Sequence, residues 1–108
     1  MRYQISLLAV TSLIIHVVLA KLKDNRAQNV ESARTLLESM NGKISFLRHL
    51  EVGTNLRSSE WAYDISLIAK FDNLKDLEAY DDHPVHLPVS NKLQELASSI
   101  VVVDYQSK

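Results

Sequence analysis

The chain has 108 residues, of which 46% are hydrophobic and 23% charged, and its net charge is −1. This length fits one domain, and the composition excludes intrinsic disorder and low-complexity sequence. With 12 basic against 13 acidic residues the chain has no basic excess to bind nucleic acid, and the absence of cysteine excludes disulfides, a thiolate nucleophile and Cys-ligated metal. A chain this short buries little surface alone, which favours self-association.

The first twenty residues allow more than one interpretation. Their apolar run is too short for a transmembrane span and is interrupted by His16. A positively charged start and a small residue, Ala20, fit a signal peptide, and cleavage there would mean export. The β-branched run 14–20 is also typical of a buried strand. We favour the strand, with residues 1–13 as a tail or mis-assigned start, a domain over 14–108, a cytoplasmic location and no membrane span in the mature domain.

The rest of the chain predicts alternating strands and helices. Apolar residues recur at spacings of three and four where a helix buries one stripe, and at spacings of two where a strand buries one face. Turn residues, among them Asn41-Gly42 and Gly53, separate these segments. In chain order we predict a strand from about residue 13 to 20, a helix over 26–40 capped by Asp24 or Asn25, strands over 43–52 and 61–71, a helix capped by Asn73 and reaching Tyr80, a helix over 91–98, and a strand over 100–105.

This order predicts an α+β fold of the ferredoxin-like βαββαβ type. Its four-stranded antiparallel sheet carries the helices on one face. The segments 14–20 and 100–103 are apolar on both sides, although the helices can cover only one face of the sheet. We therefore expect a homodimer in which two sheets pack face to face and form a dimeric α/β barrel.

Several segments together resemble the stress-responsive dimeric α/β-barrel (Dabb) family. The similar segments are Ile15–Lys23, Gly42–Ile44, Leu50–Asn55, Tyr63–Leu67 with Phe71, Leu77–Tyr80, His83–His86 and Val102–Tyr105. The resemblance covers residues 14 to 105 and implies a ferredoxin-like protomer and a homodimer. Some members of this family are polyketide cyclases, which close a poly-β-keto chain with a His base and a Tyr.

The resemblance implies the candidate site residues. It matches His86, the second histidine of His-Pro-Val-His, to the base, and Tyr80 to the assisting acid. His16, on the predicted first strand, and Asp104, on the last, are plausible supporting neighbours. A neutral imidazole can remove a proton next to a carbonyl near pH 7, and a carboxylate can fix its tautomer. The alternative is that the His-Pro-Val-His segment is only a structural corner. No cofactor is implied, and we expect no metal because Pro84 separates the two histidines and no third ligand is evident.

Three functions are compatible with these residues. The first is a homodimeric stress-responsive domain that binds a small apolar or carbonyl compound between its helices and its sheet. The second is a cofactor-independent cyclase or lyase with His86 as base and Tyr80 as acid. The third is a structural, stress-protective oligomer without a ligand. A catalyst needs a cavity of about 300 Å³ or more that reaches both residues, so the enzyme interpretation fails if large side chains fill that space, whereas the third function predicts a robust oligomer and no ligand.

Overall fold

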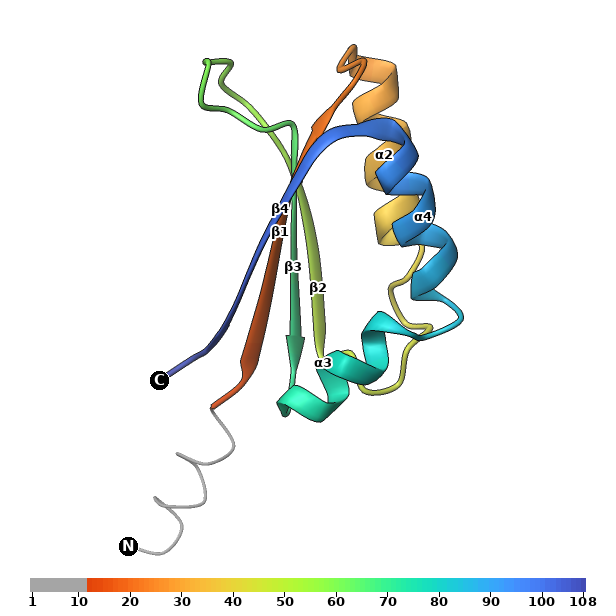
Figure 1. Cartoon of the computed structure of the whole chain (residues 1–108), viewed down its shortest axis with the longest axis vertical. Helices are drawn as coiled ribbons and strands as arrows, with labels where there is room; N and C mark the ends of the chain where they lie inside the picture. The colour runs from red at the N-terminus through yellow and green to blue at the C-terminus, as the bar shows by residue number, and fades with distance from the viewer. Residues whose placement is uncertain (1–11) are drawn as a thin grey trace, which may run out of the picture.

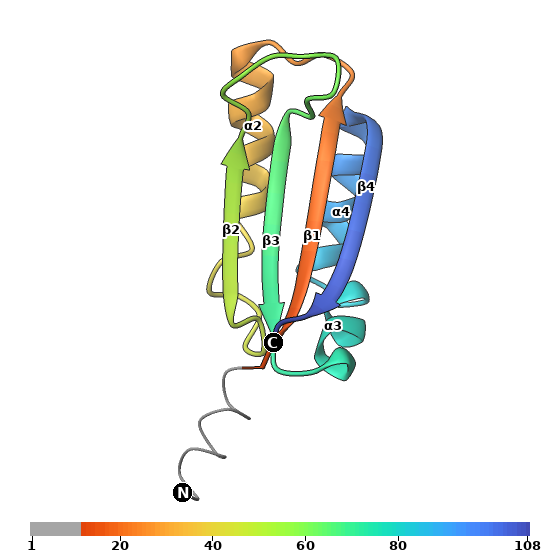
Figure 2. The same cartoon turned by 90° about the vertical axis from the view of Figure 1, so that its left-hand side faces the viewer.

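The computed structural model describes residues 12–108, so the expected tail over residues 1–13 lies almost wholly outside the described part. The elements are β1 (Ile14–Leu22), α2 (Ala27–Glu38), β2 (His49–Thr54), β3 (Ile65–Phe71), α3 (Leu74–Asp81), α4 (His86–Leu96) and β4 (Ala97–Gln106). The four strands form one antiparallel sheet in the order β2-β3-β1-β4 (Figure 2). The predicted ferredoxin-like fold is confirmed, with its second helical region divided into α3 and α4.

The helices cover one face of the sheet, as Figure 1 shows with the sheet seen edge-on. Along β3, every second residue is buried, and these residues belong to the hydrophobic core that the helices complete. The largest fully buried side chains are Tyr80, Phe71 and Met40. We call this side of the sheet the covered face. It includes Val18 and Ala20 on β1 and Ile100 on β4, which also contact the core.

The opposite side of the sheet, which we call the open face, has none of α2, α3 and α4 over it and carries apolar side chains, of which Ile15 of β1 is buried. Its exposed or half-exposed apolar residues are Val17 and Leu19 on β1, Ile68 on β3, and Val101, Val103 and Tyr105 on β4. Successive residues of a strand point to opposite faces, so Val102 belongs to the covered face and its two neighbours to the open face. The predicted two-sided apolarity of β1 and β4 is present.

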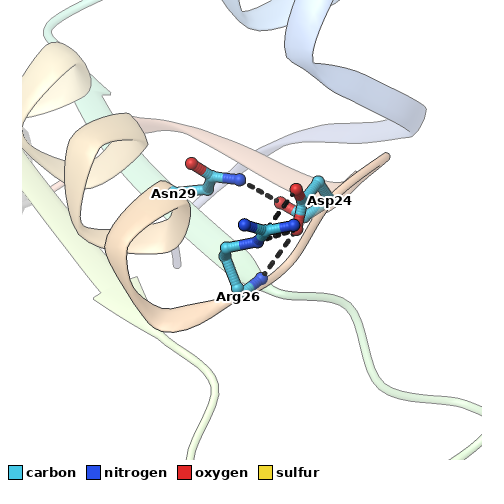
Figure 3. A network of polar contacts seen from close by, with 3 residues as sticks. All are labelled: Asp24, Arg26 and Asn29. Carbon is cyan, nitrogen blue, oxygen red and sulfur yellow. Dashed lines mark hydrogen bonds and ion pairs between the residues drawn. The ribbon is translucent and has the colours of Figure 1, made fainter.

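The entry to α2 differs from its prediction. Arg26 occupies the N-cap position without a side-chain cap, whereas Asp24 or Asn25 was expected there. Figure 3 shows the arrangement: the Asp24 carboxylate accepts hydrogen bonds from the Arg26 backbone N–H at 3.2 Å and from its guanidinium, and the Asn29 side chain donates to the Asp24 carbonyl. The Arg26 backbone N–H is the main cause of the lowered pKa of Asp24. Asp24 therefore fixes the turn before the helix and does not cap it.

The strand predicted over residues 43–52 is wrong in its first half. β2 begins at His49, and residues 43–48 form turns in which Ile44 is buried and Phe46 packs against the core. The spacing of these residues by two therefore reflects two separate contacts with the core. The helix α2 ends at Glu38 with Ser39 as its C-cap, so Gly42, with φ of 78°, lies in the turn after the helix and not at its C-terminus as predicted.

The strand predicted over residues 61–71 begins only at Ile65. Residues 61–64 belong to the connection after β2, which has no further residues to pair with them. Asp64 closes this connection, because its backbone N–H donates to the Ala20 carbonyl and its carboxylate accepts from the Leu22 N–H at 2.7 Å.

The last helix begins five residues earlier than predicted, at His86 rather than residue 91. Pro88 misled the prediction because proline breaks helix interiors, yet proline is tolerated in a first helical turn, where no N–H is needed. This earlier start matters for function, since it places His86 on the helix.

Candidate functional site

A cavity of about 450 Å³ lies between the covered face and the helices α2, α3 and α4. Most of its lining is apolar, and its polar lining residues include two histidines, a tyrosine, an aspartate, a serine and a glutamine. The lining residues are His16, Val18, Leu37, Met40, Leu67, Tyr80, Asp81, His86, Val89, Ser90, Leu93, Gln94, Ile100 and Val102. Its volume falls in the range of small-molecule sites.

His86 lies at the first position of α4 and lines the cavity. Its Nδ1 is 3.1 Å from the Asp81 carbonyl oxygen. A carbonyl can only accept, so Nδ1 carries the proton and the neutral ring keeps an unprotonated Nε2. Burial lowers the pKa of His86, an effect that the hydrogen bond to Asp81 partly opposes. The geometry therefore assigns His86 as a neutral imidazole with a free lone pair on Nε2.

Tyr80 is held by rings on both sides. It is only 1% exposed, although it also lines the cavity. Its ring centroid lies 4.1 Å from that of His86 and 5.0 Å from that of Phe71, and its hydroxyl donates weakly to Met40 Sδ at 3.9 Å. Burial, with a smaller contribution from Asp81, raises the pKa of Tyr80 well above its usual range. Tyr80 therefore stays protonated and can act as a hydrogen-bond donor.

His16 and Asp104 form a pair across two strands. The register of β1 and β4 places them directly opposite each other on the covered face. His16 Nδ1 is 2.5 Å from Asp104 Oδ1, and His16 is 9% exposed. The carboxylate fixes the tautomer with the proton on Nδ1, as the Asp81 carbonyl does for His86. The His16 ring also meets Tyr80 edge-on, with centroids 5.9 Å apart.

The two histidines of the His-Pro-Val-His segment have different surroundings. His83 Nδ1 accepts a hydrogen bond from the Val85 backbone N–H at 3.0 Å, and its ring meets Phe46 edge-on. It is absent from the cavity lining, whereas His86 is part of it. The segment thus combines a structural corner, made by His83, with a cavity residue, His86.

The structure brings three of the four predicted site residues, His16, Tyr80 and His86, to one cavity wall. Asp104 reaches the cavity only through His16. The polar lining residues Ser90 and Gln94 were not predicted from the sequence. They follow His86 at intervals of four residues on one helical face, a signal that becomes visible only when α4 starts at His86.

Residues 12–108 contain neither a metal-binding cluster nor a membrane-spanning helix. No cluster of three or more His, Cys, Asp and Glu side chains in this range could hold a metal ion. No helix in the same range has the length and apolarity to cross a membrane.

Comparison with known proteins identifies the family. Residues 14–107 match the model of the stress responsive A/B barrel domain (Dabb). A dimeric protein of ferredoxin-like fold from Bacteroides fragilis is 34% identical, with a TM-score of 0.75, and the match spans 88% of this chain and 96% of the other. A search of proteins with curated functions gave no match.

Two further solved structures share the fold. A dimeric ferredoxin-like protein from Thermobifida fusca is 25% identical, with a TM-score of 0.77, over 87% of this chain and 90% of the other. A hydroxynitrile lyase from Passiflora edulis is 15% identical, with a TM-score of 0.76, over 89% of this chain and 94% of the other. At this identity the likeness to the lyase concerns the fold alone.

Proposed function

This chain belongs to the stress responsive A/B barrel domain family, and we propose that it forms a homodimer whose protomers bind a small apolar or carbonyl compound. The ligand occupies the cavity between the helices and the sheet. The observation that carries the proposal is the cavity of about 450 Å³, in which three hydrogen-bonding rings meet a largely apolar wall.

The open face supports the homodimer. Val101, Val103 and Tyr105 are each about half exposed there, and such a contiguous apolar surface is costly in water. The neighbours from Bacteroides fragilis and Thermobifida fusca are dimeric. Two open faces packed together would bury these side chains in a common core about 10 Å thick.

The cavity chemistry supports the ligand class. Aliphatic side chains such as Val89, Leu93 and Ile100 favour an apolar body, since burying it gains about 25 cal/mol per Å². Tyr80 remains a hydroxyl donor and can satisfy a carbonyl oxygen, which would otherwise be left without a partner. A carbonyl compound with an apolar body therefore fits better than a charged metabolite.

The same geometry favours a second candidate, a cofactor-independent cyclase or lyase. The free Nε2 of His86 can take a proton from the carbon next to a carbonyl, and the C–H electron pair then forms an enolate. The enolate oxygen accepts a hydrogen bond from Tyr80. In an aldol closure the enolate carbon attacks a second carbonyl, and the His86 imidazolium returns its proton to the new alkoxide. His16, fixed by Asp104, supplies a second oriented imidazole at the same wall.

A ligand screen by thermal shift tests the proposal. Aromatic and β-keto compounds are tested against the wild type, His86→Phe and His83→Phe. A bound compound raises the melting temperature in proportion to the logarithm of its concentration above Kd. We expect a compound that binds the wild type to lose binding in His86→Phe and to keep it in His83→Phe. Of these two histidines, His86 lines the cavity and His83 does not.

Loss of binding in both variants would show that ligand binding depends on the intact His-Pro-Val-His corner and not on His86 alone. No shift with any compound, together with a stable dimer, would favour a structural oligomer without a ligand. Release of cyclised or cleaved product by the wild type, abolished in His86→Phe, would distinguish the enzyme from a simple binding protein.

A further inference from the structure

The connection between β2 and β3, residues 55–64, carries the two most exposed large hydrophobic side chains described. Leu56 is 99% exposed and Trp61 is 85% exposed. Figure 1 shows this loop leaning away from the helices, on the side of the open face, and Figure 2 shows it in front of the end of the sheet. Two large apolar groups held fully in water on one loop indicate a surface that binds a partner.

The loop is held in place by its own hydrogen bonds. The Asn55 N–H donates to the Asp64 carbonyl at 2.9 Å and closes the base of the loop. The Asn55 side chain donates to the Arg57 carbonyl, and Ser59 accepts from the backbone N–H groups of Trp61 and Ala62. Little ordering entropy remains to be lost when the loop binds, which favours a preformed contact.

A groove joins this loop to the open face. It has a volume of about 460 Å³, and loop residues including Leu56 and Tyr63 line it together with Leu19 and Ser66 of the sheet. Leu19 is one of the exposed residues of the open face. The loop therefore extends the same apolar surface that the proposed dimer uses, beyond the edge of the strands.

The strands supply a limited flat area for an interface. Four strands about 4.8 Å apart, each paired over about seven residues of about 3.3 Å, give a plan area of about 440 Å². Only part of this area is apolar, because His49 and Glu51 of β2 also face it. A standard interface buries about 800 Å² of accessible surface on each partner. Contacts beyond the strands would add to the accessible surface that the sheet supplies.

We propose that the β2–β3 loop is a second dimer contact, in which Leu56 and Trp61 pack against the other copy of this chain. The occupant is a second copy because the groove connects Leu56 of the loop with Leu19 of the open face, the surface that the proposed dimer buries. This inference rests on the proposed homodimer and adds to it the residues that anchor the two copies. Tryptophan is also the residue type most enriched among interface anchors.

Trp61 reports on this contact directly, because it is the only tryptophan of the chain. Acrylamide quenching of its fluorescence is measured for the full chain at concentrations above and below the dimer dissociation constant. Val103→Glu, which places a charge on the open face, gives the monomeric reference. We expect emission at shorter wavelength and weaker quenching in the dimer than in the monomer.

Sedimentation gives the energetic counterpart. We expect the double variant Leu56→Ser, Trp61→Ser to raise the dimer dissociation constant by at least about 10-fold. Leu74→Ser is the matched control, because Leu74 is also exposed but lies on α3, on the other side of the sheet. It should leave the constant unchanged.

The outcomes separate this inference from the proposal on which it rests. A wild-type chain that is monomeric at all concentrations overturns both. If Trp61 is quenched as strongly in the wild-type dimer as in Val103→Glu, the loop contact alone is overturned, whatever the dimer dissociation constant. An unchanged dissociation constant in the double variant also overturns the loop contact alone.

Discussion

The two faces of the sheet have similar apolar sequences and different surroundings. On the covered face Leu67, Ala69 and Phe71 are buried under helices of the same chain. On the open face Val101, Val103 and Tyr105 remain about half exposed. The covered face leaves an unfilled volume that polar rings line, whereas the open face presents the aliphatic side chains of β1 and β4 beside the polar side chains of β2. Hydrophobicity alone therefore does not assign a role to a strand; what packs on each face does.

The two faces alternate along β4 within three residues, although Val102 on the covered face is as exposed (54%) as Val103 on the open face (55%). Val102 lines the cavity, while Val101 and Val103 point to the open face. Such alternation lets one strand serve a ligand site and an interface at once. Substitutions on β4 and its neighbours can therefore test the two faces separately.

The largest expected effect comes from matched truncations on the two faces. Leu67→Ala should lower the free energy of unfolding by about 2–5 kcal/mol at any protein concentration, because Leu67 packs within its own chain. Val101→Ala should have little effect in the monomer and should destabilise only above the dimer dissociation constant. Urea denaturation at several protein concentrations measures both losses. Equal and concentration-independent losses would contradict the distinction between the faces.

A smaller effect is expected at the His16–Asp104 pair. Asp104→Ala removes the acceptor of the buried His16 ring and should cost about 1–3 kcal/mol, near the low end because Asp104 is partly exposed. The reference is Asp72→Ala, which breaks the exposed pair of Asp72 with Arg48 and should cost less. Dimer affinity should remain unchanged in both variants. A larger loss with Asp72→Ala would mean that His16 gains nothing from its position on the covered face.

The smallest expected effect is a pH dependence at His86. Burial lowers the pKa of His86 in the folded chain below the ordinary value of about 6.5. The unfolded chain therefore binds the proton first as the pH falls. The contribution of the neutral ring is complete above about pH 6.5 and is lost as the pH falls towards the lower folded pKa. Stability measured between neutral and mildly acidic pH should fall more in the wild type than in His86→Phe, and an equal fall would refute the assignment.

The sequence predicted the fold well because its longest signals are periodic. Strand β3 alternates buried and half-buried residues over its whole length, and α2 repeats its apolar residues at helical spacing. The errors occur where tertiary contacts override the local pattern. Ile44 and Phe46 follow a strand spacing because each reaches the core from a turn. Residues 61–64 continue the alternation of β3, but β2 ends before it can pair with them.

The candidate site was only partly predictable. Predicting that His16 and Asp104 lie opposite each other requires the register of β1 and β4, which no local sequence pattern fixes. They were selected because they lie on the predicted first and last strands. Ser90 and Gln94 were missed because Pro88 hid the first turn of α4. The cavity itself depends on how the helices pack on the sheet, and no sequence pattern contains that information.

The most direct test of the two roles uses the methyl groups of β4. NMR spectra of the valine-labelled chain are recorded during titration with a hit compound and, separately, during dilution. We predict that the ligand shifts the Val102 signals, while dilution shifts those of Val101 and Val103. A ligand that shifts Val101 and Val103 but not Val102, or dilution that shifts all three equally, would contradict the assignment of one face to the ligand and the other to the second copy.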